Sequence, residues 1–278
     1  MPAGFLASEA GIRLVAFLAI FVSMALFELW SPRLERPEMR GALKSRRWLT
    51  NLSIVILSSA LLRVVFPAAA VGAALWAEAN GYGLMRVVGL NGVVAGIIAF
   101  VVLDFAVWFE HLVSHKIPLL WRIHRMHHAD TGFDVTTALR FHPLEILVSM
   151  LWKAAIVIAL GAPVVSVLIF EIVLNGTSMF NHSNIRLPDR VDAILRRVIV
   201  TPDMHRVHHS TNPAETDSNY GFNFSFWDRL LSTYTRVPAL GQDGMNIGLN
   251  EYRDDRPAGL WWSLALPFRR LGRQISRN

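Results

Sequence analysis

The residues of this sequence that could do chemistry are histidines: the chain has ten, and eight of them fall in three short clusters. The clusters have the forms H-x3-H, H-x2-H-H and H-x2-H-H, and they contain His111 and His115, then His124, His127 and His128, then His205, His208 and His209. On a helix, spacings of three and four residues put side chains on one face, one turn apart. Eight imidazoles packed together without a metal would leave donors and acceptors unpaired, or would crowd positive charge. The pattern therefore predicts metal binding.

The number of histidines indicates how many metal ions to expect. Imidazole nitrogen suits zinc, copper, iron and nickel. A closed structural zinc site needs four ligands, so eight ligands exceed the need of one ion. The clusters therefore predict two metal ions in an all-nitrogen ligand shell.

The scaffold that positions these clusters is predicted by composition. The chain has 278 residues, 53% of them hydrophobic, and its mean hydropathy is +0.37. Several charge-free runs approach the length of about 20 residues that crosses a bilayer. We expect an all-α fold, a polytopic membrane helical bundle in one domain, with a cytoplasmic-side helical cap that holds a histidine-rich dimetal site.

The apolar runs predict where the spans lie. We expect spans at about 14–30, 49–76 and 87–109, then a hairpin of 144–160 and 163–180, with a cap made of 110–143 and 181–235 and a basic interfacial tail at 258–278. The second span is either one long tilted helix or a helix broken at Pro67. Gly161 and Pro163 offer the hairpin turn. A single crossing there would put the third histidine cluster across the bilayer from the first two, so we favour the hairpin.

Net charge and cysteine content further limit the class of protein and the cofactors it could hold. The formal net charge is +6, and the loop between the first two spans is rich in arginine, which by the positive-inside rule makes it cytoplasmic. Nucleic-acid binding explains this charge poorly, because the basic residues flank apolar runs. The absence of cysteine excludes disulfides, thiolate-held iron–sulfur clusters and thiolate haem. The N-terminal tail lacks a positive region, so we expect no cleavable signal peptide and a multi-pass protein, in a bacterial inner membrane rather than the endoplasmic reticulum.

The histidine clusters and three nearby segments resemble the fatty acid hydroxylase, or sterol desaturase, superfamily of integral membrane non-haem diiron enzymes. Asp104, Phe105, Trp108 and His111 resemble its D-F…W-x-x-H helix. Residues 140–145, RFHPLE, resemble its R-x-H-P-x-E segment, and 219–221 (NYG) with 227–229 (WDR) resemble its closing segment. The likeness covers about residues 104–234.

The resemblance extends the list of site residues. Relatives often carry an additional H-x3-H at FNHSN, which implies that His182 is a ninth metal ligand, although Ser178 stands where the partner histidine would be. We expect Asp104 and Asp203 to orient ligands by accepting an imidazole N–H. Asp104 could instead be a helix-end charge at the membrane interface. We expect His142 to lie beside a ligand or the substrate rather than on a metal.

The resemblance implies an O2-dependent oxidoreductase that hydroxylates a C–H bond of a membrane lipid, such as a sterol or a fatty acyl chain, with two Fe ions as cofactor. Desaturation begins with the same hydrogen abstraction and stays open. The reaction needs electrons, and the chain has no haem box or credible dinucleotide loop, so we expect a separate electron-donor redox protein. A metallohydrolase is disfavoured because Glu110 precedes His111 instead of lying within H-E-x-x-H. A metal carrier is disfavoured because the histidines cluster at one membrane face.

Overall fold

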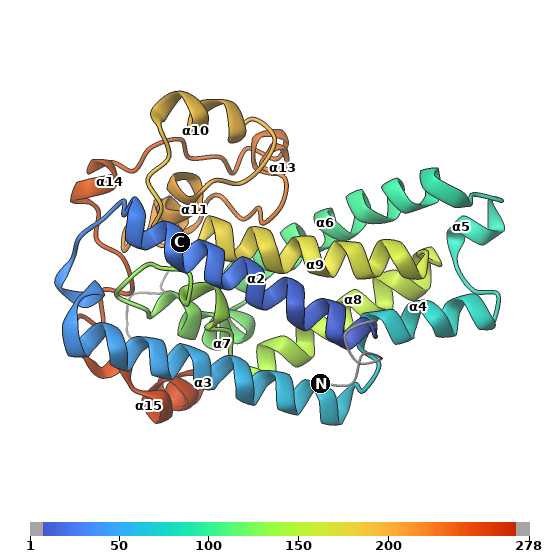
Figure 1. Ribbon diagram of the computed structural model, residues 1–278, viewed down its shortest axis with the longest axis horizontal. Coiled ribbons are helices and arrows are strands. Elements are labelled where there is room, and N and C mark those ends of the chain that lie inside the picture. The colour runs from blue at the N-terminus through green and yellow to red at the C-terminus, as the bar shows by residue number, and fades with distance from the viewer. Residues whose placement is uncertain (1–7, 271–278) are drawn as a thin grey trace.

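The structure is a computed structural model that describes residues 8–270. Long helices lie side by side as a bundle, and short helices gather at one end of it as a cap (Figure 1). Among the described residues there is no β-strand, only isolated bridges such as that between Pro32 and Ile185. The predicted all-α membrane bundle is therefore confirmed.

Five helical segments within residues 8–270 are long and apolar enough to cross a membrane. They are α2 (Glu9–Trp30), the segment Gly41–Val87, α6 (Gly92–Lys116), α8 (Pro143–Leu160) and α9 (Val164–Asn181). Large apolar side chains remain exposed on their outer faces, including Leu26, Val64, Val93 and Val165. A bundle that spans a bilayer needs such an apolar outer surface, because lipid replaces water there.

Local capping and proline decide where two of these helices begin and end. α2 starts at Glu9, ahead of the apolar run, because the Ser8 side chain accepts a hydrogen bond from the Gly11 backbone N–H. The segment Gly41–Val87 consists of α3 (Gly41–Val65), α4 (Ala69–Ala79) and α5 (Leu84–Val87). The break between α3 and α4 falls at Pro67, which cannot continue a helix from the preceding turn.

A hairpin of α8 and α9 brings the chain back to the cap. α8 ends at Gly161, whose φ of 65° is the left-handed conformation that glycine adopts without strain. α9 begins after Pro163. His142 therefore lies at the start of α8 and His182 at the end of α9, both at the cap end of the bundle (Figure 1).

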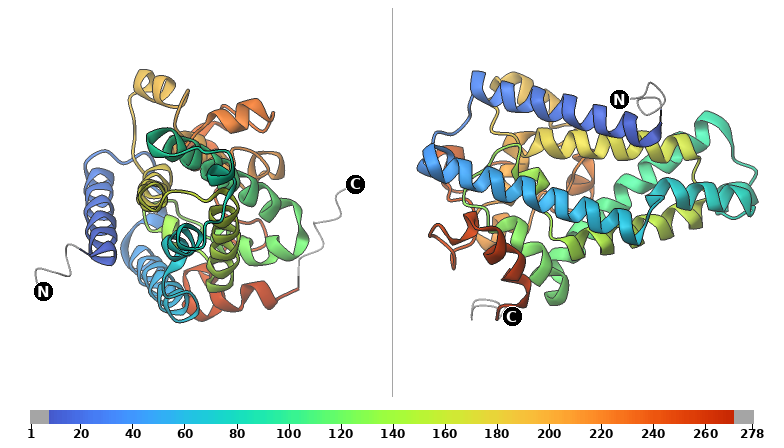
Figure 2. Two further views of the ribbon diagram at one scale, coloured as in Figure 1. Left: turned by 90° about the vertical axis from the view of Figure 1, so that its right-hand side faces the viewer. Right: turned by 60° about the horizontal axis from the view of Figure 1, so that its bottom comes forward.

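The cap is built from short helices and the loops between them. Its helices are α7 (Pro118–His128), α10 (Asp189–Leu195), α11 (Pro202–His208), α12 (Pro213–Thr216), α13 (Phe226–Leu230), α14 (Gly241–Gly244) and α15 (Leu260–Ala265). Figure 2 shows the bundle end-on, with α2 at its edge beside α9. Of the expected interfacial tail, α15 and the following turn pack against α7, where the Arg125 side chain donates to the carbonyl of Leu266. Residues 271–278 of that tail lie outside the described residues.

Buried charges on the membrane helices fasten the cap. Arg47 of α3 is 1% exposed, and its guanidinium donates to Asp130 at 2.6 and 2.9 Å and to Asp134 at 3.0 Å. The Glu28 carboxyl of α2 accepts hydrogen bonds from the backbone N–H groups of Val135 and Asn184. The loop after α7 and the segment after α9 are thus held to α3 and α2, which positions the histidines that precede them.

Candidate metal centre

Nine of the ten histidines gather at the cap end of the bundle in two sets. The five-histidine set contains His111, His115, His124, His128 and His208. The four-histidine set contains His127, His182, His205 and His209. Within each set, one candidate ligand atom from every residue lies within 4.8 Å of those of the others. The nine residues that sequence reasoning selected as metal ligands are therefore all brought together.

Each H-x2-H-H cluster is divided between the two sets. On α7, His124 and His128 are one turn apart and join the five-histidine set, whereas His127 turns into the four-histidine set. The cluster on α11 divides in the opposite sense: it sends His208 to the five-histidine set, and His205 and His209 to the four-histidine set. Adjacent positions on a helix point about 100° apart, so one cluster can serve two neighbouring metal ions.

Hydrogen bonds at Nδ1 orient four of the imidazoles. His124 Nδ1 lies 2.5 Å from a Glu145 carboxylate oxygen. Three other rings donate from Nδ1 to backbone carbonyls: His111 to Tyr220 at 2.7 Å, His208 to Ser218 at 2.6 Å and His182 to Ser178 at 2.7 Å. A carbonyl oxygen can only accept, so in these three rings the proton is on Nδ1 and Nε2 keeps its lone pair for a metal.

The Nε2 atoms converge as metal ligands would. His182 Nε2 lies 3.1 Å from Nε2 of both His127 and His205, and the Nε2 atoms of His124 and His128 are 3.2 Å apart. Nitrogens bound about 2.1 Å from one metal ion are separated by about 3.0 to 3.4 Å, depending on the coordination geometry. The Nε2 atoms of several rings, including His111 and His208, are buried with no hydrogen-bond partner within residues 8–270. Such atoms are costly unless something binds them, so the donor set fits two metal ions.

Burial keeps these imidazoles in the form that binds metal. Removal from water lowers the pKa of His182 to about 4 and that of His208 to about 3. Burial, together with the neighbouring imidazoles, also lowers the pKa of His127 and His205 well below the usual value. Neutral imidazole is the metal-binding form, so the site is ready for metal at neutral pH without first losing protons.

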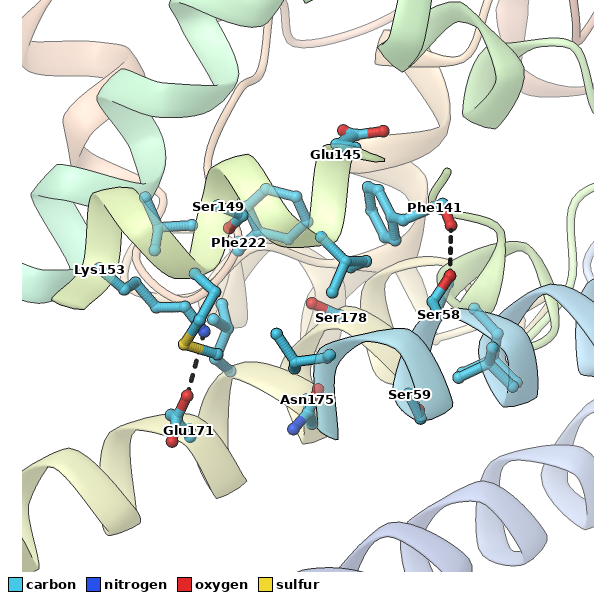
Figure 3. Close-up of a pocket in the computed structure, with 18 of the residues that line it drawn as sticks. Ser58, Ser59, Phe141, Glu145, Ser149, Lys153, Glu171, Asn175, Ser178 and Phe222 are labelled. Carbon is cyan, nitrogen blue, oxygen red and sulfur yellow. Dashed lines mark hydrogen bonds and ion pairs between the residues drawn. The ribbon is translucent and has the colours of Figure 1, made fainter. Parts of the chain in front are cut away.

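A cavity of about 360 Å³ extends from the five-histidine set into the bundle, and we call it the bundle cavity. His111 and His124 line it, in contact with the rings of Phe222 and Phe141. Figure 3 shows these two phenylalanines in the wall of the cavity. Ligand pockets usually have volumes of about 300 to 1,000 Å³, so this cavity can hold part of a lipid. The exposed residues Ser59 of α3 and Asn175 of α9 also line it, so it opens sideways between these membrane helices.

The wall of the bundle cavity is polar along α8. Ser149 donates to Glu110 at 3.1 Å, and farther along Lys153 lies 3.1 Å from Glu171, which also pairs with Arg13 (Figure 3). Charged side chains at membrane depth are costly, and they usually face a cavity and mark a functional site. The cavity therefore has phenylalanine rings and the Glu110 and Glu145 carboxylates at its histidine end, and a cluster of charged side chains deeper in the bundle.

Asp104 and Asp203 hydrogen-bond to residues other than histidine. The Asp104 carboxylate accepts from the Trp227 indole at 2.8 Å. Asp203 pairs with Arg206 and, at 3.3 Å, with Arg33. Within residues 8–270 neither carboxylate is bonded to a metal-ligand histidine. Both hold cap segments against their neighbours.

His142 is the one histidine outside both sets. Its Nδ1 accepts from the Leu144 backbone N–H at 3.1 Å, which caps the N-terminus of α8. Its Nε2 lies 3.2 Å from the carbonyl oxygen of Leu264, to which it donates. Both ring nitrogens therefore have backbone partners.

Two carboxylates with a direct structural link to the ligands received no role from sequence reasoning. Glu145 contacts His124, as described above. Asp228 accepts from the backbone N–H groups of Tyr220 and Gly221 at 2.9 and 3.0 Å, and so fixes the segment whose carbonyl orients His111. Glu145 lies in the R-x-H-P-x-E segment and Asp228 in the W-D-R segment, so the sequence did contain a signal for them.

Comparison with known proteins agrees with this geometry. Residues 96–233 match the family model described as Fatty acid hydroxylase. The chain is 30% identical over 178 residues to the ornithine lipid hydroxylase OlsE of Rhizobium tropici, and this match covers 64% of the chain and 51% of that protein. It is 26% identical to human alkylglycerol monooxygenase, in a match that covers 49% of the chain and 29% of that protein. It is 27% identical to human cholesterol 25-hydroxylase, in a match that covers 49% of the chain and 50% of that protein.

The matches therefore cover about half of two of these relatives and under a third of the other. No solved structure matches the chain. The family match spans α6 to the segment after α13 and contains every histidine of both sets. Through this region, the chain belongs to the fatty acid hydroxylase superfamily.

Proposed function

We propose that this chain hydroxylates a membrane lipid with O2, using two iron ions held by the two histidine sets. The observation that carries this proposal is the bundle cavity, which runs from His111 and His124 to an opening between membrane helices. A lipid can enter such a cavity from the bilayer without passing through water. The relatives described above are hydroxylases or monooxygenases by name, and their names refer to ornithine lipid, alkylglycerol and cholesterol.

The iron ions, when bound, would supply the O2 chemistry that takes hydrogen from an unactivated C–H bond, which side chains cannot do alone. In the overall reaction one oxygen atom enters the C–H bond and the other leaves as water, at the expense of two electrons and two protons from outside. The protein holds the imidazoles neutral, orients them through Glu145 and the backbone carbonyls, and seats the lipid beside His111 and His124. The Phe141 and Phe222 rings beside His124 and His111 exclude water from the reacting carbon.

The electrons come from a separate redox protein. The sequence has no cysteine, which excludes thiolate-held iron–sulfur clusters. The loop between α2 and α3 lies on the cap side and carries Arg33, Arg36 and Arg40, and the first turns of α3 add Lys44, Arg46 and the buried Arg47. We place this side, and the single membrane domain's active site, on the cytoplasmic face of a bacterial inner membrane. Turnover with O2 and lipid in the absence of any added donor would contradict this part of the proposal.

The function is tested on detergent-purified protein prepared without O2. We expect about two irons per chain, and O2 consumption that depends on an electron donor and a lipid substrate. Ornithine lipid, alkylglycerol ether and sterol are offered separately, and the products are analysed by mass spectrometry. Hydroxylation adds one oxygen atom, whereas desaturation removes two hydrogens. His124→Ala should lose iron and activity but still insert in the membrane. Stoichiometric zinc with O2-independent hydrolysis would overturn the proposal.

A further inference from the structure

The two histidine sets differ in what surrounds them. All four members of the four-histidine set have no exposed side-chain surface. In the five-histidine set, His115 is the one member that is not buried. The sets thus differ in how open they are to other molecules.

Two cavities reach the five-histidine set. The bundle cavity is lined by His111 and His124. A second cavity, of about 480 Å³, is lined by His115 and Trp121 and by polar residues of the cap that include Asp217, Asn250 and Glu251. One cavity opens among the membrane helices and the other is bordered by exposed charged residues of the cap. No member of the four-histidine set lines either cavity.

Two phenylalanine rings cover the four-histidine set. The Phe141 ring stacks on His127 with centroids 4.3 Å apart and an interplanar angle of 12°. The centroid of the Phe133 ring lies 5.1 Å from that of the His209 ring and 5.8 Å from that of the His182 ring. Phe141 also lines the bundle cavity (Figure 3), so its ring lies between that cavity and His127. A flat ring in van der Waals contact leaves no room for a small molecule beside the imidazole.

We propose that substrate and O2 meet the metal of the five-histidine set alone, and that Phe141 closes the metal of the four-histidine set off from the bundle cavity. This inference rests on the proposed function, because it assigns the reaction to one of two metal positions. The four-histidine set has fewer donors, so on ligand number alone it would keep more open coordination positions than the five-histidine set. Packing opposes that order, because phenylalanine rings lie against its imidazoles and no member of the set lines either cavity. Phe141 is thus a positioning residue that decides where a small molecule can bind.

The test uses nitric oxide, a small ligand of ferrous iron, on the reduced, iron-loaded protein. The number of iron–nitrosyl adducts per chain is counted by electron paramagnetic resonance, and the iron content of the same sample is measured. We expect about one adduct per chain in the unaltered protein, because one metal position is open. Phe141→Ala should give about two, because it removes the ring over His127. Leu139→Ala is the matched control, because Leu139 lines the same cavity but, unlike Phe141, has no ring to stack on a histidine. This variant should keep about one adduct per chain.

Two adducts in the unaltered protein, or one adduct in Phe141→Ala with both irons retained, would overturn the inference. If Phe141→Ala loses iron, Phe141→Leu takes its place, because it keeps an apolar side chain but removes the flat ring. A protein that contains no iron would refute the proposed function instead. Azide titration of the cobalt-loaded protein, followed by its visible spectrum, would then decide between one and two open positions.

Discussion

Replacing His182 with alanine tests the division of the ligands into two sets. The change removes one of four donors from the four-histidine set and none from the five-histidine set. Metal binding by four protein ligands is worth about 10 to 16 kcal/mol, which is about 2.5 to 4 kcal/mol per ligand if it is shared equally. Each 1.4 kcal/mol is a factor of ten in affinity, so we expect the affinity of this set to fall by about 10² to 10³. The affinity of the five-histidine set should change little.

The measurement is metal content after dialysis against a chelator at a concentration that leaves the unaltered protein fully loaded. We expect about two ions per chain in the unaltered protein and about one in His182→Ala. His142→Ala is the matched control: it also removes an imidazole at the cap end of the bundle, but from outside both sets, and it should keep about two ions. If His182→Ala keeps both ions, or if His142→Ala loses as much metal, the assignment of ligands to sets is refuted.

Three further predictions concern the groups that hold the ligands in place. Glu145→Gln replaces the charged acceptor at His124 with a neutral amide, so we expect metal affinity to fall by about 10- to 100-fold in a chelator competition; an unchanged affinity would show that Glu145 does not support this ligand. Arg47→Met leaves Asp130 and Asp134 buried without their partner, so the free energy of unfolding in detergent should fall by about 3 to 5 kcal/mol, and a loss under about 1 kcal/mol would contradict the ion pair's role. The Arg47 guanidinium holds the pKa of Asp130 at about 2, below the usual 3.8. The stabilisation of the folded protein by this ion pair is therefore present above pH 3.8 and is lost as the pH falls toward 2. Thermal unfolding across this window should therefore respond more steeply to acid in the unaltered protein than in Arg47→Met, and equal slopes would refute this.

The histidine spacings predict eight of the nine members of the two sets, and the family resemblance predicts His182, but neither predicts how the nine are divided. His127 and His128 are neighbours in the chain and belong to different sets, as do His208 and His209. That division depends on how α7, α9 and α11 pack against one another. Helical spacing shows which residues share a face of one helix, and it contains no information on which metal position that face meets.

Several supports of the site are invisible to sequence reasoning for a physical reason. The carbonyls of Tyr220, Ser218 and Ser178 orient imidazoles, and every residue has such a carbonyl, so no residue type marks them. The expected role of Asp104 followed from its helix face, which it shares with His111 and His115, and that of Asp203 from its closeness to His205 in the chain. In the folded chain their carboxylates accept hydrogen bonds from the Trp227 indole and the Arg206 guanidinium.

The hairpin shows what sequence reasoning can do when a functional constraint is available. The apolar residues from α8 to α9 could form one helix of excessive length or two helices of ordinary length. The requirement that the histidine clusters meet at one membrane face selects the second, and Gly161 and Pro163 supply the turn. The break between α3 and α4 had no such constraint, and there Pro67 alone marks the place.

Orientation of ligands by peptide carbonyls has a consequence for how the sequence of this protein can change. A point substitution replaces a side chain and leaves the backbone carbonyl in place. Substitution of Tyr220, Ser218 or Ser178 should therefore leave the orientation of the three imidazoles unchanged. Insertion or deletion of one residue between Ser218 and Tyr220 would shift both carbonyls at once and misdirect two ligands together. Variation in this lineage should therefore accumulate as substitutions around a segment of fixed length.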